Sequence, residues 1–468
     1  MRKTFFIVMA AALFLTSCSG GSKKSETKET RPMFTGAKGE VKLMTTDPGH
    51  FHAALIQKTM YDMVNPLVHV YAPEGAELDG HLRLVESYNN RPEEPTSWEN
   101  KIYTGPDYLE KMLSEKPGNV VVLAGNNAKK DDYILESVKA GLNVLADKPM
   151  IITADEFPKL EQAFEIAAEN EVLLYDIMTE RFEITSIMQR ELSKIPEIFG
   201  TLQEGTPEEP AITKESVHHF SKQVSGSPLI RPAWFFDVEQ QGEGIVDVTT
   251  HLVDLIQWEA FPEEILSKED VEIVSARRWT TDLTPEMFSK VTRLDEYPGY
   301  LQKNVDGTTL KVFSNGEINY RLKGIHARVS VIWNFEAPQG AGDTHYSIMR
   351  GTKSNLIIKQ SKEENYIPTL YVEVAAEEDI KAFESNLDKS VHQDLNAAYP
   401  GLKLNKRSNN LWEVQIPAVY REGHEAHFGQ VTKNFLSFLA TGEMPAWEVP
   451  NMIVKYYTTT EGLKAAMK

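Results

Sequence analysis

Three polar residues of the sequence have the types and the spacing that oxidation of an alcohol requires. Asp247 and His251 are four residues apart, so on a helix their side chains share one face. An imidazole ordinarily titrates near neutrality, so His251 suits proton transfer, and Asp247 can orient it or hold a hydroxyl. Lys148 follows an apolar run, and its ammonium can polarise an oxygen that becomes a carbonyl. The simpler alternative is a lysine in a surface turn and a capped histidine in the core.

Short apolar runs that alternate with helical patterns surround Lys148. Strands separated by helices favour right-handed crossovers and a doubly wound parallel sheet. Ligands of such sheets bind at the carboxyl ends of the strands, where Lys148 is expected. The predicted strands are 41–46, 67–71, 119–124, 143–146 and 172–176; the predicted helices are 51–63, 108–113, 131–140 and 154–170, and residues 74–99 form a polar stretch.

The pattern changes after about residue 184. A helix at 184–192 and mixed polar sequence are followed by longer runs in which apolar and polar residues alternate, which is typical of an antiparallel sheet with one covered face. We therefore predict a second, α+β domain with a large, mainly antiparallel sheet. Its strands are expected at 271–279, 309–314, 317–322, 327–334, 355–359, 370–374 and 411–416, and its further helices at 377–396, 427–441 and 449–468.

The central part of the chain resembles the Gfo/Idh/MocA oxidoreductases. The resemblance covers most of residues 40–260, and the matching segments are 140–141, 144–145, Asp147-Lys148-Pro149, 172–182 and the glycine-rich turn and helix of 242–254. It implies an N-terminal Rossmann-type dinucleotide-binding domain. It also implies that Lys148, Asp247 and His251 form the catalytic set.

The loop after the first strand departs from the usual dinucleotide motif. GxGxxG lets the backbone approach a pyrophosphate, but residues 44–53 read MTTDPGHFHA and keep only Gly49, while Asp47 brings a negative charge. The resemblance implies a tightly bound NAD or NADP. Its predicted contacts are Thr46, Gly49, His50, Phe51, Asn126, Asn127, Lys130, Asp147 and Lys148.

Two further residues are candidate substrate contacts. Trp234 can stack on a sugar face, although buried aromatic packing is the ordinary role of such a residue. Arg181 can reach cofactor or substrate, or form a structural ion pair. The histidines within 424–427 lack zinc-motif spacing and are interpreted as a chance pair near a helix start. The pair at 218–219 is interpreted as a polar loop pair, and a metal role for this pair, or for His251 with Asp247 and Asp254, is the minor alternative. No metal site is predicted.

Composition and charge exclude some classes of protein. The 468 residues include 49 basic and 68 acidic ones, a net charge of −19, and are 41% hydrophobic. A globular chain with a sizeable core is therefore expected. Nucleic acid is not an expected partner, because phosphate affinity depends on Lys and Arg. One cysteine excludes an internal disulfide.

The N-terminus has the pattern of an export signal. Residues 1–17 combine a basic start with a short apolar run, and Leu15-Thr16-Ser17-Cys18 resembles the lipobox of bacterial lipoproteins. The resemblance implies lipidation of Cys18, a flexible tether at 18–38 and a place in the bacterial cell envelope, on the outer membrane facing the periplasm. An ordinary signal peptide with a chance cysteine is the alternative.

These observations lead to one functional hypothesis and one alternative. The hypothesis is a lipid-anchored, NAD(P)-dependent oxidoreductase that acts on a sugar, glycoside or polyol, with a dinucleotide-binding domain at 39–183 and a substrate and self-association domain at 184–468 that makes a homo-oligomer. Export requires a tightly held cofactor, and redox-assisted glycoside cleavage is a related reaction. The alternative is a sugar-binding lipoprotein that kept the fold and lost the cofactor.

Overall fold

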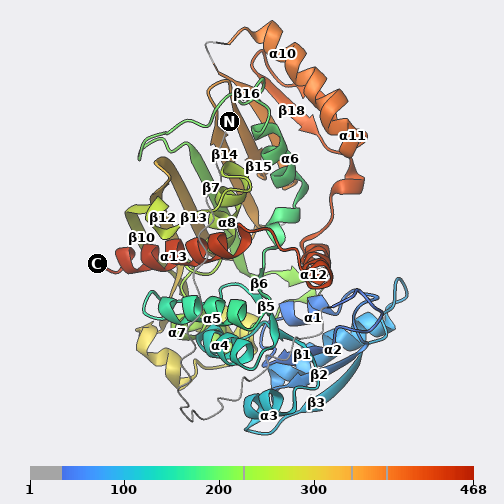
Figure 1. Cartoon of the computed structure of the whole chain (residues 1–468). Helices are drawn as coiled ribbons and strands as arrows, with labels where there is room; N and C mark the ends of the chain where they lie inside the picture. The colour runs from blue at the N-terminus through green and yellow to red at the C-terminus, as the bar shows by residue number, and fades with distance from the viewer. Residues whose placement is uncertain (1–33, 225–226, 339–340, 376–377) are drawn as a thin grey trace, which may run out of the picture. The chain divides into compact units, whose positions relative to one another are not determined.

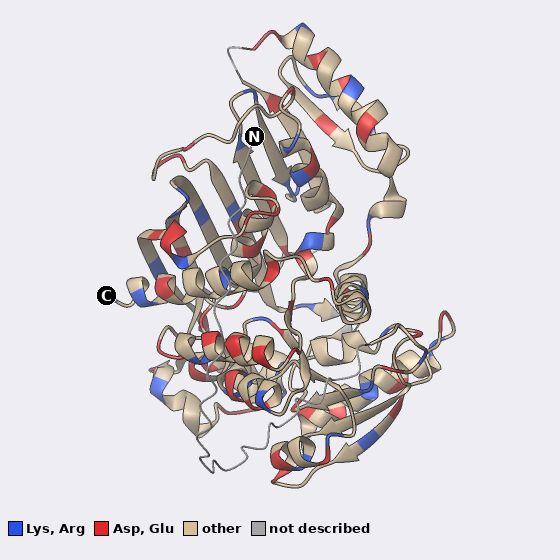
Figure 2. Ribbon diagram, in the orientation of Figure 1, with Lys and Arg blue, Asp and Glu red and all other residues tan. Residues whose placement is uncertain are grey.

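The computed structural model describes residues 34–224, 227–338, 341–375 and 378–468. Cys18, the expected signal peptide and most of the expected tether lie outside these residues. The described residues belong to one compact unit, Phe34–Lys468. No helix within these ranges is long and apolar enough to cross a membrane. Lys and Arg alternate with Asp and Glu over the elements of both sheets (Figure 2).

A parallel sheet forms the first half of the unit, as predicted, and it has six strands where five were expected (Figure 1). The order β3-β2-β1-β4-β5-β6 is that of a Rossmann fold. All four residues of β4 are buried, because helices cover both faces of the sheet. The strands are β1 (Leu43–Thr46), β2 (Leu67–Tyr71), β3 (Glu99–Tyr103), β4 (Val120–Leu123), β5 (Asn143–Asp147) and β6 (Leu174–Ile177), and the helices are α1 (His52–Ile56), α2 (Ala76–Asn90), α3 (Tyr108–Glu115), α4 (Lys130–Lys139) and α5 (Phe157–Glu169).

The sequence prediction was wrong at two places in this half. The stretch 74–99, interpreted as polar, contains helix α2, and strand β3 follows it. Helix α2 escaped the pattern because its buried face combines Leu78, Val85 and Tyr88 with the histidine His81. The helix expected at 51–63 ends at Ile56.

A large mixed sheet forms the second half and confirms the predicted α+β arrangement. Its order is β10-β12-β13-β7-β14-β15-β16-β18-β17, with β11 paired to β12, and only the β13–β7 pair is parallel. The strands are β7 (Ile212–Ser221), β10 (Val271–Leu283), β11 (Val305–Asp306), β12 (Thr309–Leu322), β13 (Ile325–Glu336), β14 (Thr344–Arg350), β15 (Ser354–Lys359), β16 (Thr369–Val374), β17 (Lys403–Lys406) and β18 (Leu411–Gln415). The principal helices are α6 (Ile184–Ser193), α8 (Thr249–Ala260), α9 (Pro285–Thr292), α10 (Ile380–Lys389), α12 (His424–Thr441) and α13 (Glu448–Ala466).

Strand β7 lies in the middle of this sheet but was not predicted. Its sequence, ITKESVHHFS, is too polar for the usual strand pattern. Lys214 is fully buried in an ion pair with Glu259, and the histidines of the strand face a cavity. The two runs predicted at 309–314 and 317–322 are one continuous strand, β12.

The two closing helices connect the halves of the unit. Phe428, Phe435, Met452 and Tyr456, from α12 and α13, belong to the hydrophobic core of the parallel sheet. Val454 and Leu463 of α13 belong instead to the core of the second sheet. Helix α13 lies between the two sheets (Figure 1), so it holds both in place around the cavity described next.

Candidate active site

A large cavity lies where the carboxyl ends of the parallel strands meet the second sheet. Its volume is about 1380 Å³. This exceeds the roughly 300–1,000 Å³ of an ordinary small-molecule pocket, so two ligands can share it. Eight of the twelve histidines of the chain line it: His50, His52, His218, His219, His251, His345, His424 and His427.

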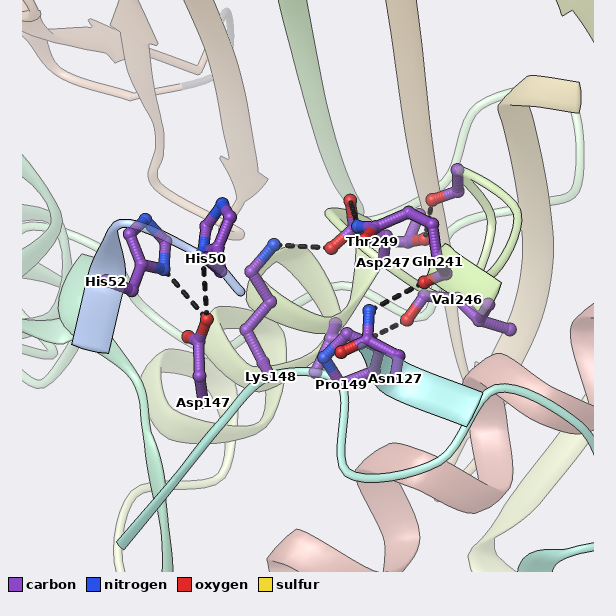
Figure 3. Close-up of polar contacts among 12 residues, drawn as sticks. His50, His52, Asn127, Asp147, Lys148, Pro149, Gln241, Val246, Asp247 and Thr249 are labelled. Carbon is purple, nitrogen blue, oxygen red and sulfur yellow. Dashed lines mark hydrogen bonds and ion pairs between the residues drawn. The ribbon is translucent and has the colours of Figure 1, made fainter. Parts of the chain in front are cut away.

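An ion pair between Lys148 and Asp247 occupies the floor of the cavity (Figure 3). Lys148 follows the last residue of β5, and its Nζ lies 2.5 Å from Oδ1 of Asp247. The side chains are 10% and 6% exposed, so water screens the pair weakly. Burial alone would raise the pKa of Asp247, but the ammonium of Lys148 outweighs it and lowers that pKa. Gln241 Nε2 donates a further hydrogen bond, 3.2 Å long, to Asp247 Oδ2.

His251 lies in the first turn of α8 and lines the same cavity, as predicted. The expectation that Asp247 orients it was wrong, because Asp247 precedes the helix and its carboxylate holds Lys148 and Gln241 instead. The expected titration near neutrality was also wrong. Burial and then the charge of Lys148 lower the pKa of His251 to about 4. The imidazole is therefore neutral at pH 7, and its buried Nδ1 has no hydrogen-bond partner among the described residues.

The predicted cofactor residues of the first loop divide into two groups. His50 and Phe51 line the cavity. Thr46 does not contact it, because it is buried and its hydroxyl donates to Sδ of Met112 at 3.0 Å. Gly49 is covered: a Cβ at this position would lie 3.0 Å from Cζ2 of Trp234.

The predicted residues after β4 also have different roles. Asn127 lines the cavity and donates to the backbone oxygen of Gln241 at 2.6 Å. Asn126 caps the next short helix, accepting from the backbone of Ala128 at 3.0 Å. The prediction that Lys130 contacts the cofactor was wrong, because its side chain is buried away from the cavity.

Lys130 positions the backbone on both sides of Lys148. Its Nζ donates to Asn127 Oδ1 at 2.6 Å and to the backbone oxygens of Asp147 and Pro149 at 2.9 and 3.1 Å. Burial lowers the pKa of Lys130 to about 8. A positioning role, not cofactor contact, follows from these three bonds.

Neither predicted substrate residue reaches the cavity. Arg181 forms buried ion pairs with Asp254 and Glu448, which confirms the structural alternative. Trp234 is 8% exposed, and its Nε1 donates to Oε1 of Glu77 at 2.9 Å.

A different aromatic wall faces the cavity. Trp333 and Phe235 line it, and the guanidinium carbon of Arg231 lies 5.2 and 4.4 Å from their ring centroids. Rings fixed in this way can stack on the apolar face of a sugar.

A polar wall from β7 was missed by sequence reasoning. Residues 218–219 belong to this strand, so their interpretation as a loop was wrong. His219 Nδ1 lies 3.0 Å from Oδ1 of Asp343, and His218 Nδ1 lies 3.3 Å from Oδ2. Lys222 Nζ lies 2.8 Å from the same Oδ2. The only sequence signal was the dense polarity of a short segment, which does not distinguish a loop from a strand at a cavity.

The first turn of α12 forms the remaining edge of the cavity. His424 begins this helix, which confirms that the pair at 424–427 marks a helix start. His424 Nδ1 lies 3.3 Å from Oε1 of Glu180. His427 is buried beside them.

His52 was not among the predicted site residues, although it lines the cavity. Its Nδ1 lies 2.9 Å from Oδ2 of Asp147, and Nδ1 of His50 lies 3.3 Å from the same oxygen. Asp147 therefore faces two imidazoles, while the neighbouring Lys148 reaches in another direction (Figure 3).

Comparison with known proteins agrees with this architecture. A crystal structure titled "putative oxidoreductase" from Parabacteroides merdae is 56% identical, covers 93% of this chain and 99% of its own, and has a TM-score of 0.91. KijD10, a 3-ketoreductase from Actinomadura kijaniata in complex with NADP and TDP-benzene, is 11% identical over 91% of this chain and 97% of its own, with a TM-score of 0.55. A "putative myo-inositol dehydrogenase" from Sinorhizobium meliloti is 11% identical with the same coverage and a TM-score of 0.52. At such identities these two share the fold alone.

Sequence comparison with curated proteins gives no significant match. The family described as "Putative oxidoreductase C terminal domain" matches residues 188–467, which is most of the second half. The fold expected from the resemblance to Gfo/Idh/MocA oxidoreductases is the fold that these neighbours share. The chain therefore belongs to the oxidoreductase family that this C-terminal domain defines.

Proposed function

We propose that the protein is an NAD(P)-dependent oxidoreductase acting on a hydroxyl group of a sugar, glycoside or polyol. The observation that carries this proposal is the buried Lys148–Asp247 pair beside a neutral His251, in a cavity at the strand ends of a Rossmann sheet. A bound nicotinamide dinucleotide supplies a hydride acceptor, which no side chain provides. The NADP complex of KijD10 supports this cofactor class.

The residues fit the nicotinamide end of a dinucleotide. In the order β3-β2-β1-β4-β5-β6, successive strands are added on one side of β1 up to β3 and on its other side from β4 onward. Such cofactors bind at this switch point between β1 and β4. Gly125 after β4 lines the cavity together with Asp147 and Lys148. A Cβ at Gly125 would lie 2.1 Å from the backbone oxygen of Asp47, so only glycine permits this close approach of the two loops. Over Gly49, the indole of Trp234 covers the loop that usually holds a pyrophosphate.

Each residue of the floor has a distinct task in alcohol oxidation. Asp247 fixes the ammonium of Lys148, which donates a hydrogen bond to the substrate oxygen and stabilises negative charge there. His251 is neutral at pH 7 and has a ring nitrogen that is free among the described residues, so it can receive the hydroxyl proton, but with a pKa of about 4 it is a weak base that must pass the proton on to water. In the reverse direction the same groups polarise a carbonyl and return the proton.

The walls of the cavity suit a carbohydrate. Trp333 and Phe235 offer ring faces, and the ion pair of Asp343 and Lys222, beside the ends of β14 and β7, offers charged hydrogen-bonding groups. Aromatic faces combined with polar groups are the usual means of holding a sugar ring. The Sinorhizobium meliloti neighbour, described as a "putative myo-inositol dehydrogenase", supports a polyol or sugar substrate.

We further propose that the protein acts outside the cytoplasm, anchored to the outer membrane by lipid on Cys18 and facing the periplasm. The lipobox-like end of the apolar N-terminal run supports this location. Such a protein needs a cofactor that stays bound between turnovers. Redox-assisted cleavage of a glycoside, in which the cofactor is restored each cycle, and assembly into a homo-oligomer belong to the same proposal.

The first test asks whether the full chain retains a dinucleotide. The protein is purified in detergent and denatured, and the supernatant is analysed by mass spectrometry for NAD and NADP. Near-stoichiometric dinucleotide supports the proposal. None, together with no binding when NAD or NADP is added, refutes it and favours the sugar-binding alternative.

The second test asks whether Lys148 and His251 act in the reaction. Sugars and polyols are screened for reduction of the bound dinucleotide, followed by its absorbance. Lys148→Met and His251→Ala should lower the rate constant by at least about 100-fold. Lys111→Met changes an exposed lysine outside the cavity and should leave the rate unchanged.

A further inference from the structure

We propose that His50, His52 and Asp147 form a binding site for a divalent transition-metal ion at the edge of the cavity. In the part of the chain that the structure describes, they are the one group of three His, Cys, Asp or Glu residues whose ligand atoms lie within 4.8 Å of one another. The proposal stands on side-chain geometry and does not depend on a dinucleotide.

Two of the three separations match the edges of a metal coordination shell, and the two imidazoles offer ligand atoms within 4.8 Å of each other. Ligand atoms about 2.1 Å from a metal lie about 3.0 Å apart in an octahedron and about 3.4 Å apart in a tetrahedron. Oδ2 of Asp147 lies 2.9 Å from Nδ1 of His52 and 3.3 Å from Nδ1 of His50. An ion can therefore enter between these atoms with little movement of the side chains.

One of these atoms has no other partner. Nδ1 of His50 is buried and makes no hydrogen bond in the described structure, although it lies near the carboxylate. A buried polar atom without a partner costs about 1–3 kcal/mol. A metal ion would satisfy this nitrogen, whereas a proton shared with Asp147 does not reach it in suitable geometry.

The charges of the cluster also suit a cation. The carboxylate of Asp147 is 4% exposed, and in the described ranges its ion-pair partners are the two imidazoles alone. The nearby ammonium of Lys130 helps to lower the pKa of the Asp147 carboxylate, but it donates its hydrogen bond to the backbone oxygen of Asp147 and forms no ion pair with the carboxylate. Burial favours neutral imidazoles, which is the form that binds metals.

The surrounding structure fixes the ligands and leaves one side open. The ring of His52 packs against Phe428 with centroids 4.5 Å apart. His50, His52 and Asp147 all line the cavity, so the remaining coordination positions face a substrate or water.

Two imidazoles and one carboxylate favour Zn²⁺, Co²⁺, Fe²⁺ or Mn²⁺ over Ca²⁺ or Mg²⁺. The ion would sit next to Lys148 along the chain. Its open coordination positions would face the cavity.

Cobalt(II) tests the proposal, because its visible absorption reports ligand number without requiring enzymatic activity. The full chain is freed of metal with a chelator and titrated with Co²⁺. One equivalent should bind and give the bands of a site with nitrogen ligands. His52→Gln and Asp147→Asn should each weaken binding at least about tenfold. His392→Gln alters an exposed histidine outside the cavity and should not change it.

Two outcomes would overturn the proposal: no stoichiometric Co²⁺ binding, or binding that both variants leave unchanged. If either variant fails to fold by circular dichroism, His50→Gln replaces it, because Nδ1 of His50 makes no hydrogen bond whose loss would unfold the chain. Dinucleotide retention is measured on the same preparations. Co²⁺ bound without dinucleotide would preserve the metal site and refute only the proposed oxidoreductase cofactor.

Discussion

Replacing Arg181 with methionine should lower the stability of the folded protein and leave its affinity for a dinucleotide or sugar unchanged. The guanidinium donates to both carboxylate oxygens of Asp254, at 2.7 Å each, and to Glu448 at 3.0 and 3.1 Å. The three side chains are 9%, 2% and 4% exposed. The sequence left open whether this arginine binds substrate, so the experiment decides between two physical roles.

The expected magnitude follows from what the substitution leaves behind. Asp254 would keep Lys455, whose Nζ is 2.8 Å away, and Glu448 would keep only the hydroxyl of Tyr175 at 3.3 Å. Removing one partner of a buried ion pair typically costs about 3–5 kcal/mol. We expect the free energy of unfolding of Arg181→Met to fall by that amount.

Urea unfolding followed by tryptophan fluorescence measures this free energy. Arg277→Met is the matched control, because Arg277 pairs with Glu317 but is 66% exposed, and its loss should change stability by less than about 1 kcal/mol. The reasoning fails if Arg181→Met changes stability by less than about 1 kcal/mol while dinucleotide or sugar affinity drops. That result would show that Arg181 contributes to ligand binding.

Three further predictions test single features of the fold, each by urea unfolding. His81 is buried with both ring nitrogens unpartnered in the described structure, and burial lowers its pKa to about 4. The unfolded chain binds a proton on this histidine more tightly than the folded chain does. Between pH 6.5 and pH 4 the proton therefore favours the unfolded state, so this histidine's contribution to stability is complete above pH 6.5 and is lost as the pH falls toward 4. His81→Leu should remove about 2 kcal/mol of that loss at pH 5; equal pH dependence in both proteins would contradict this. Gly125→Ala should destabilise the protein strongly, because its Cβ would lie 2.1 Å from the backbone oxygen of Asp47. Gly80→Ala, inside helix α2, should instead stabilise the protein by about 0.5–1 kcal/mol. Similar effects of the two substitutions would argue against the close approach of the two loops. Lys130→Met should lower stability by at least about 1.5–3 kcal/mol through loss of its charged hydrogen bonds, and an unchanged midpoint would refute its positioning role.

The elements that local pattern determines were predicted well. The apolar run of β4 and the runs of β5 and β6 identified a parallel sheet, because strands buried on both faces have few polar residues. Lys148 was placed correctly because it directly follows such a run. Helix α2 and strand β7 were missed because His81 and Lys214 are buried polar residues that break the pattern.

The alternation of apolar runs and helices, and the motif around Lys148, Asp247 and His251, determined the fold class and the floor of the site. These features depend on neighbours along the chain. The tertiary structure alone decided which partner each charged group takes. His52 meets Asp147 across 95 residues of sequence, and Arg181 meets Glu448 across 267. Such contacts arise from how the helices and sheets pack, and burial then sets the pKa of His251, so no local spacing can reveal them.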